Sequence, residues 1–294
     1  MDDGLYRELR PFVFSIAYRM LGTASEAEDV VQESFLRFHR AGGDEIRAPK
    51  SFLATVATRL SIDRLRSARA RREQYFGTWL PEPIVTDDEL EARDEADTAD
   101  SLSLAFLVLL ESLTPVERAV FLLREVFEYD YGEIARIVGK REDNVRQIAA
   151  RARRHVDERR PRFDASRAER ERLAQRFFAA ASEEDREALA ELLAPDVVFY
   201  GDGGGKVKGA IPRPVFGRDR VARLLLGFAR TGEELGLRVH PAEVNGQPGF
   251  VVLTPDGAPF SVMALDIADG VITAVRSIVN PDKLGHLVGA EPGA

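Results

Sequence analysis

Residues 114–160 read TPVERAVFLLREVFEYDYGEIARIVGKREDNVRQIAARARRHVDERR, which is the pattern of three consecutive short helices. Thr114 and Pro115 supply an N-cap and a proline at the first helical position, and apolar residues then follow at helical spacing. After a break at residues 129–132 comes a helix of two turns, which Gly139 can close because glycine readily adopts the left-handed cap conformation. The stretch therefore predicts a small three-helix domain.

The third helix of this stretch has one apolar face and one basic face. Val145, Ile148, Ala149 and Ala152 are expected to face the core, and the other side carries Arg146, Gln147, Ala150, Arg151, Arg153 and Arg154. Such a face suits the major groove of DNA, and the three helices match a helix-turn-helix. The expected cap, Arg141, cannot accept a backbone N–H, so acidic residues in the first turn must stabilise the helix start. The alternative is a solvated basic face, which the three-helix context disfavours.

The N-terminal part, from Leu5 to about Glu73, is helical throughout and carries charges of both signs. Ser25 and Glu28 are spaced as a capping box that would open a helix. The polar face of that helix is mostly acidic: Glu28, Asp29, Gln32, Glu33 and Arg37. This face is either a solvated surface or a docking site for a basic protein partner.

The next predicted helix begins near Ser51 and has a basic surface made of Arg59, Arg64, Arg66, Arg69, Arg71 and Arg72. It follows a polar loop, residues 41–50, that contains two glycines. A cationic helix behind such a loop suits a surface that follows a single DNA strand and holds an unstacked base. The alternative is a solvated basic helix end.

Composition restricts the class of protein. The net charge is −8 although basic helices are present, because acidic residues concentrate between Glu82 and Asp100, where the one basic residue is Arg93. The chain has no cysteine, which excludes disulfides, thiolate zinc sites and thiol redox sensing. The first residues lack the order of a signal peptide, and no apolar run has the length of a membrane span. We expect a cytoplasmic protein that does not bind a membrane, with no metal and no cofactor.

After Pro161 the pattern changes to that of an α+β domain. Helices are expected at about 168–181 and 185–193, and strands at 197–200, 237–244, 250–253, 260–267 and 271–279, which would form an antiparallel meander. Phe199, Asp202, Met263 and Arg276 are candidates to face a pocket, with core packing as the alternative. His240 and His286 have no carboxylate nearby in the sequence, so we predict no catalytic base and no enzyme. Residues 202–206, DGGGK, lack the spacing of a phosphate loop and are expected to form a turn or a hinge.

Three segments resemble the extracytoplasmic-function (ECF) sigma factors of bacterial RNA polymerase. AEDVVQESFLR (residues 27–37) resembles the family's core-binding helix in region 2, and residues 50–66 resemble its promoter-melting segment. Residues 113–153 resemble region 4, which reads the minus-35 element in this family. Two positions depart from the family pattern: many members have asparagine where Arg59 stands and serine or threonine where Arg141 stands.

The resemblance implies partners for each charged face. RNA polymerase core is expected to bind through its beta-prime clamp helices and beta flap, and promoter DNA is the second partner. The core-binding residues would be Glu28, Asp29, Gln32 and Glu33, and the minus-10 residues Arg59, Asp63, Arg64, Arg66 and Arg69. The minus-35 residues would be Lys140, Arg146, Gln147, Arg151, Arg153 and Arg154.

Further resemblance indicates the subgroup of these sigma factors with a fused SnoaL-like C-terminal domain, whose fold is a cone-shaped α+β. It rests on WLPEP (79–83), DGGGK (202–206) and NPDKL (280–284). We expect the C-terminal domain to dock on the connector and regulate in cis through Trp79, Leu80, Pro81, Asp202, Lys206, Asn280, Pro281, Asp282 and Lys283. A small-molecule ligand of this domain has no support in the sequence.

The sequence thus predicts a multidomain chain of two all-α domains followed by an α+β domain. The expected divisions are region 2 at 1–74, an acidic linker at 75–105, region 4 at 106–162 and the SnoaL-like domain at 163–294. One rival function is a ligand-responsive helix-turn-helix regulator that does not bind core polymerase, which leaves the N-terminal motif unexplained. A second rival is an enzyme whose helical part serves dimerisation.

Overall fold

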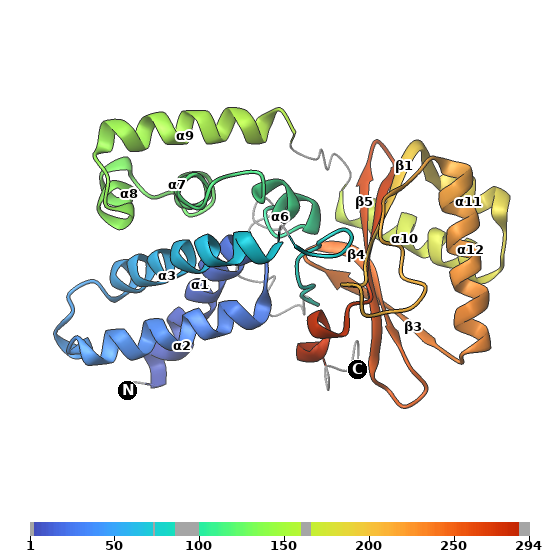
Figure 1. Cartoon of the computed structure of the whole chain (residues 1–294), viewed down its shortest axis with the longest axis horizontal. Coiled ribbons are helices and arrows are strands. Elements are labelled where there is room, and N and C mark those ends of the chain that lie inside the picture. Colours follow the sequence, from blue (N-terminus) through green and yellow to red (C-terminus); the bar gives the residue numbers. More distant parts are fainter. Residues whose placement is uncertain (1–2, 73, 86–99, 160–165, 288–294) are drawn as a thin grey trace. The chain divides into compact units, whose positions relative to one another are not determined.

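The computed structural model describes residues 3–72, 74–85, 100–159 and 166–287. The chain forms two compact units, Met1–Gln74 with Leu107–Arg160, and Tyr75–Phe106 with Pro161–Ala294 (Figure 1). The connector between the two helical parts of the first unit therefore belongs to the second unit. Among the described residues, no helix combines the length and the apolar character that a bilayer crossing requires.

The N-terminal part of the first unit is a bundle of α1 (Asp3–Leu21), α2 (Ala24–Arg40) and α3 (Pro49–Arg72), with the short η1 (Gly43–Glu45) between the last two. The predicted capping box at the start of α2 is wrong. Thr23 is the N-cap, without a side-chain cap bond, so Ser25 already lies inside the helix, where Glu28 pairs with Arg10. The break before α2 is made by Gly22, whose positive φ of 67° an L side chain rarely adopts.

The second part of the first unit contains α7 (Pro115–Glu125), α8 (Tyr131–Val138) and α9 (Glu142–Asp157), and the division between the two units falls within α6 (Leu104–Leu110). The local signals behave as predicted. Thr114 forms a capping box with Glu117, Gly139 closes α8 in the left-handed conformation, and Arg141 starts α9 without a side-chain cap bond. The three-helix core of α7, α8 and α9 consists of Val120, Leu123, Ile134, Ala135, Ile137, Val145, Ile148 and Ala149.

The C-terminal part of the second unit has a six-stranded sheet in the order β2-β1-β6-β5-β4-β3. The strands are β1 (Leu193–Asp202), β2 (Val215–Phe216), β3 (Arg238–Val244), β4 (Gln247–Leu253), β5 (Pro259–Ala268) and β6 (Val271–Ile278). Helices α10 (Arg167–Ser182), α11 (Arg186–Leu192) and α12 (Arg218–Glu234) cover one face of the sheet and build its core with it (Figure 1). Two short turns, η2 (Pro281–Lys283) and η3 (Gly285–Leu287), follow β6.

The fold class is confirmed as two all-α parts followed by an α+β domain, but the antiparallel meander is wrong at one pair. Strand β1 runs parallel to β6, with Phe199 opposite Val275, whereas β3 to β6 pair antiparallel through hairpins. Two parallel strands need a long crossover, and the chain uses α12 and the β3–β5 hairpins for it. Helix α12 was not predicted, although its buried side chains recur at helical spacing: Val221, Ala222, Leu225 and Leu226.

Candidate functional site

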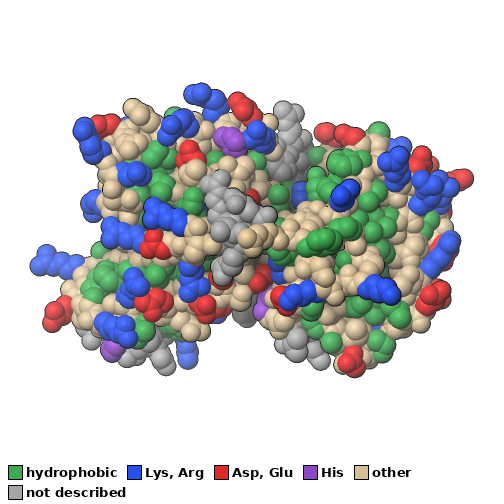
Figure 2. Space-filling model, viewed as in Figure 1, with side chains coloured by type: hydrophobic (Ala, Val, Ile, Leu, Met, Phe, Trp, Pro, Cys, Tyr) green, Lys and Arg blue, Asp and Glu red, His purple; other side chains and the backbone are tan. Residues whose placement is uncertain are grey.

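The recognition-type helix α9 presents the two faces that its sequence pattern predicts. Val145, Ile148, Ala149 and Ala152 are buried, while the other face exposes Arg146, Gln147, Arg151, Arg153 and Arg154, with Lys140 exposed just before the helix. Figure 2 shows Lys and Arg side chains gathered over the α8 and α9 part of the molecule. A helix with this exposed basic face can enter a major groove and contact phosphates and base edges.

The side chain of Arg146 is fixed more closely than its exposure suggests. Its Nη2 donates to Glu142 Oε1 at 2.6 Å, and its guanidinium carbon lies 4.5 Å from the ring centroid of Tyr131. Arg124, at the end of α7, lies 4.7 Å from the centroid of the same ring. Tyr131 and Arg124 were not predicted as site residues, because the three side chains come from three helices and have no shared local spacing.

The acidic face of α2 is paired with arginines of the same unit. Glu28 accepts from Arg10 at 2.5 Å, Asp29 accepts from Arg64 at 3.2 Å, and Glu33 accepts from Arg37 at 2.7 Å. The side chain of Gln32 is exposed. Each of the six paired side chains keeps more than 30% of its surface exposed. Exposed pairs of this kind contribute about 0–1 kcal/mol, so a basic partner can replace the arginines at small cost.

The predicted minus-10 residues on α3 lie in different surroundings. Asp63 and Arg66 form an exposed pair with each other, and Arg64 reaches Asp29 on α2. Arg59 instead donates from Nε to Ile137 O at 2.8 Å and from Nη2 to Arg136 O at 2.9 Å. The side chain of Arg69 lies outside the described residues.

Arg59 therefore caps the carboxyl end of α8, where unpaired carbonyls attract a cation. A second arginine makes the reverse contact: Arg118 of α7 is 2% exposed and donates to Met20 O, near the carboxyl end of α1, at 2.6 Å. Arg118 also donates to Leu110 O at 3.0 Å. Each helical part of the first unit thus contributes an arginine that caps a helix of the other part.

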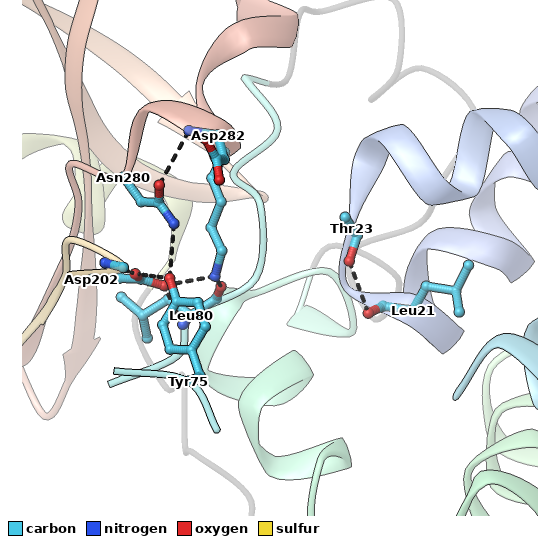
Figure 3. A network of polar contacts seen from close by, with 9 residues as sticks. Leu21, Thr23, Tyr75, Leu80, Asp202, Asn280 and Asp282 are labelled. Atoms are coloured by element: carbon cyan, nitrogen blue, oxygen red, sulfur yellow. Dashed lines mark hydrogen bonds and ion pairs between the residues drawn. The ribbon is translucent and has the colours of Figure 1, made fainter. Parts of the chain in front are cut away.

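The three short motifs of the second unit meet at the Asp202 carboxylate (Figure 3). This side chain is fully buried at the end of β1, and Oδ2 accepts from Leu80 N at 2.8 Å and from Lys283 Nζ at 2.7 Å. Its Oδ1 accepts from Tyr75 Oη and from Gly204 N. Burying a carboxylate is tolerated here because four donors surround it, and one of them is the Lys283 cation.

Lys283 fills the centre of this cluster. Its Nζ also donates to Leu80 O and lies 4.4 Å from the ring centroid of Trp79 and 4.9 Å from that of Tyr75. Two aromatic faces, a carbonyl and a carboxylate together replace the water that a buried ammonium loses. We call Tyr75, Trp79, Leu80, Asp202, Asn280 and Lys283 the connector latch.

Asn280 and the glycines of the 202–206 loop complete the connector latch. Asn280 Nδ2 donates to Tyr75 Oη at 2.9 Å, and its Oδ1 accepts from Asp282 N at 3.2 Å, which caps η2. Gly204 has φ of 58°, and a Cβ there would lie 2.4 Å from Asn280 Nδ2. The loop is a glycine-rich turn that lets the backbone approach Asn280, and Lys206 pairs with Asp282 at its exposed rim.

Burial raises the pKa of the Tyr75 phenol above its ordinary value, and the hydrogen bond and charge of Asp202 add to the effect. The phenol thus stays a neutral donor over the range in which free tyrosine begins to ionise. Tyr75 was not predicted as a member of this cluster. It lies 127 positions from Asp202 in the chain, and no local pattern points to that contact.

Asn245, at the turn between β3 and β4, holds both ends of the connector. Its Oδ1 accepts from Ile84 N at 2.9 Å, its backbone N donates to Ile84 O at 2.8 Å, and its Nδ2 donates to Leu102 O at 3.0 Å. Asn245 has φ of 55°, which asparagine tolerates better than most residues. Asn245 and Gly246 form the turn between these strands, and no local pattern in the sequence indicated that Asn245 also holds the connector. The acidic residues between Val85 and Asp100 lie outside the described residues.

The four candidates for a pocket lining pack against other protein groups. Phe199 is 1% exposed in the core of the sheet, and Met263 packs against the same core. Arg276 donates to Asp266 from Nε at 3.0 Å and from Nη2 at 2.8 Å, and Asp202 belongs to the connector latch. Phe199 and Met263 thus match the alternative of core packing, while Asp202 and Arg276 are engaged in ion pairs.

The two histidines of the C-terminal domain have separate surroundings. The ring of His286 contacts Pro83 O at 2.8 Å, so it adds to the hold on the connector. The Nε2 atom of His240 on β3 is buried without a hydrogen-bond partner. Within the described residues, no group of three or more His, Cys, Asp or Glu side chains is arranged to hold a metal ion.

Comparison with known proteins gives a family match for each part of the chain. Residues 5–71 match the model of sigma-70 region 2, residues 103–156 that of sigma-70 region 4, and residues 174–275 that of the SnoaL-like domain.

Individual relatives match nearly the full length. The chain is 38% identical to the ECF RNA polymerase sigma factor SigJ of Mycobacterium tuberculosis, over 96% of this chain and 93% of the relative. It is 34% identical to a probable ECF RNA polymerase sigma factor, SigI, of the same species, over 96% and 94%. The crystal structure of SigJ from M. tuberculosis superimposes with a TM-score of 0.76 at 35% identity, covering 96% of this chain and 98% of that one.

Proposed function

Because this chain belongs to the ECF RNA polymerase sigma factors, we propose that it directs promoter-specific transcription initiation and that its SnoaL-like domain regulates this activity in cis. The observation that carries the proposal is the pair of oppositely charged faces, on α2 and α9, within the two matched sigma regions. A regulator that acts without core polymerase would have no use for the acidic α2 face. The proposal places the protein in the cytoplasm, where RNA polymerase works.

The proposed contacts follow the charges. Glu28, Asp29, Gln32 and Glu33 of α2 would meet basic groups of the polymerase core, and α3 would engage the minus-10 element. The exposed side chains of α9, with Lys140, would engage the minus-35 element. In this scheme the chain divides into region 2 (1–74), a connector (75–105), region 4 (106–162) and a regulatory domain (163–294).

A direct test is reconstitution of purified core RNA polymerase with the full chain. We expect stable copurification and run-off transcription from a subset of genomic fragments. The double charge reversal Asp29→Lys with Glu33→Lys should abolish both, because the α2 face would repel a basic partner. The matched control, Glu183→Lys with Glu187→Lys in exposed positions of the C-terminal domain, should leave both intact. Failure of the wild-type chain to bind core polymerase would contradict the proposal.

The regulatory part of the proposal rests on how the connector is held. Its two described ends, 75–85 and 100–106, are both fixed on the C-terminal domain, through the connector latch and through Asn245. A free connector of about 30 residues spans roughly 100 Å when extended. Minus-10 and minus-35 elements about 25 base pairs apart are separated by roughly 85 Å of B-DNA. Holding both ends on one domain therefore limits how far regions 2 and 4 can separate, and release would remove the limit.

Run-off transcription also tests this restraint. Lys283→Met weakens the connector latch without touching the helical parts, so we expect more transcript per sigma at limiting core polymerase. Lys208→Met, an exposed lysine just beyond the same loop, is the control and should match the wild type. Unchanged or reduced output from Lys283→Met would contradict cis restraint while leaving the sigma function intact.

The C-terminal domain serves as a regulatory module rather than an enzyme in this proposal. Two of its buried carboxylates, Asp202 and Asp266, are engaged by the cations of Lys283 and Arg276, which leaves neither of them free as a general acid or base. The ring of His286 contacts a connector carbonyl. The test is turnover: hydrolysis or isomerisation by the full chain that is lost in Asp266→Asn would contradict a purely regulatory role.

A further inference from the structure

Arg146 is held by groups from α8 and from the first turn of its own helix. Glu142, four residues earlier on α9, accepts from Arg146 Nη2 at 2.6 Å. The Tyr131 ring, at the start of α8, lies 4.5 Å from the Arg146 guanidinium and 4.7 Å from that of Arg124. Tyr131 is itself anchored, since its side chain packs against the core shared by α7, α8 and α9.

The Arg146 guanidinium has further N–H donors besides the one that contacts Glu142. An arginine has five N–H groups, and the Glu142 contact uses one of them. The side chain keeps 59% of its surface, on the face of α9 that also exposes Gln147 and Arg151. Enough N–H groups therefore remain for a bidentate contact with a guanine, the contact that arginine most often makes in the major groove.

Fixing Arg146 before it binds matters because a long side chain loses much rotamer freedom when it is ordered. A planar guanidinium over an aromatic ring is favourable for both charge and shape, and the carboxylate fixes its rotation. Other arginines of the helix are held less closely: Arg153 lies 3.9 Å from Glu125 and 3.7 Å from Asp157, beyond hydrogen-bond distance. Arg141 pairs with Asp143 at 2.8 Å, but 85% of its side-chain surface is exposed.

We infer that Tyr131 and Glu142 are positioning residues that set the pose in which Arg146 reads one or two base pairs of the minus-35 element. They determine specificity at those base pairs and contribute little to affinity for DNA in general. The inference rests on the proposed function, because it requires that α9 engages promoter DNA. Neither residue needs to touch a base.

The experiment is selection from a duplex library randomised over the promoter region, using core RNA polymerase reconstituted with the full chain. Wild-type protein should enrich a motif, and Arg146→Ala should flatten one or two adjacent positions, where discrimination falls by roughly 5- to 150-fold. Tyr131→Leu should flatten the same positions by about two- to fivefold. Glu142→Gln should do so by about twofold. Tyr131→Phe keeps the ring and should match the wild type.

Two controls separate positioning from a general loss of structure. Thermal melting of each variant checks the fold, and Glu142→Gln, on the exposed first turn of α9, carries the test if Tyr131→Leu does not fold. In the background of Arg146→Ala, Tyr131→Leu and Glu142→Gln should cause no further loss of specificity, because the group that they position is gone.

The outcomes are distinguishable. A wild-type protein that enriches no motif contradicts the proposed function itself. A motif that Arg146→Ala flattens, but that both Tyr131→Leu and Glu142→Gln leave unchanged, overturns the positioning role. Uniform weakening of every position by these two variants also overturns it, since that result indicates a structural effect.

Discussion

Replacing Lys283 by methionine should destabilise the second unit strongly, although the lysine is one side chain on a short turn. Lys283 is 7% exposed and its Nζ lies 2.7 Å from the fully buried Asp202 carboxylate. Methionine has a similar length but cannot donate to Asp202 or to Leu80 O, and it loses the cation contacts with two rings. The carboxylate would then be buried without its cation.

The size of the effect follows from what remains around Asp202. Removing one partner of a buried ion pair usually costs about 3–5 kcal/mol. Three donors remain, from Tyr75, Leu80 N and Gly204 N, and they favour the lower end of that range. We therefore expect a loss of about 3 kcal/mol in the free energy of unfolding, or a urea midpoint lower by roughly 1–2 M.

The assay is urea denaturation followed by tryptophan fluorescence. Trp79 is the single tryptophan of the sequence, and its ring lies 4.4 Å from Lys283 Nζ, so the signal reports on the connector latch. Lys206→Met is the control, because Lys206 and Asp282 keep 52% and 61% of their side-chain surface. An exposed pair of this kind is worth about 0–1 kcal/mol.

Two results test whether burial of the Lys283–Asp202 ion pair is the cause of the predicted loss of stability. The reasoning fails if Lys283→Met and Lys206→Met lower the urea midpoint by the same amount, because burial of the pair is then irrelevant. Adding Asp202→Asn to Lys283→Met should restore part of the lost stability, since an amide removes the unpaired charge and keeps an acceptor for Leu80 N. A double variant that is less stable than Lys283→Met would show that charge burial is not the cause.

Three further predictions concern single contacts. The phenol pKa of Tyr75 is raised in the folded state, so its stabilising contribution holds below the ordinary tyrosine pKa near 10 and is lost as pH rises above it. Urea midpoints at about pH 8 and pH 10.5 should therefore differ less in Tyr75→Phe than in the wild type. Thr114→Ala should cost about 1 kcal/mol in the thermal unfolding of the first unit, because α7 loses its capping box. The Thr114 hydroxyl lowers the pKa of Glu117, so this cost should shrink as pH falls below about 4.5. Arg59→Ala should speed amide hydrogen exchange at the carboxyl end of α8 by about tenfold, whereas Arg66→Ala, which removes an exposed pair, should not.

Local rules were sufficient where a helix end or a helix face depends on residues close in the chain. The N-cap at Thr114, the closing Gly139 and the buried and exposed faces of α9 were predicted from local sequence, and the structure confirms them. The capping box that Thr114 forms with Glu117 was not predicted. The predicted start of α2 was wrong because two residues, Thr23 and Ser25, can each place a hydroxyl near the end of the helix. Thr23, rather than Ser25, has the extended backbone of an N-cap.

Pairings between distant residues could not be predicted in this way. The parallel contact of β1 with β6 depends on the path of the whole domain, and α12 was overlooked because its apolar stripe is short and interrupted by arginines. Tyr75 and Asn245 carry no local sign that they hold the connector, since their partners lie more than 120 positions away. The resemblance to a subgroup of sigma factors supplied the three motifs, but not the donors and acceptors that join them.

Several of the charges that mark the proposed partner surfaces already have partners within the first unit. Asp29 pairs with Arg64, so a predicted core-binding residue and a predicted minus-10 residue neutralise each other, and Arg59 caps α8. Binding of polymerase or DNA then exchanges an internal contact for an external one, and the net gain is the small difference between the two. It also couples the surfaces, because a basic polymerase group that takes Asp29 leaves Arg64 free for a phosphate. Such coupling is reciprocal, so binding of polymerase core should strengthen binding of promoter DNA, and binding of DNA should strengthen binding of polymerase core.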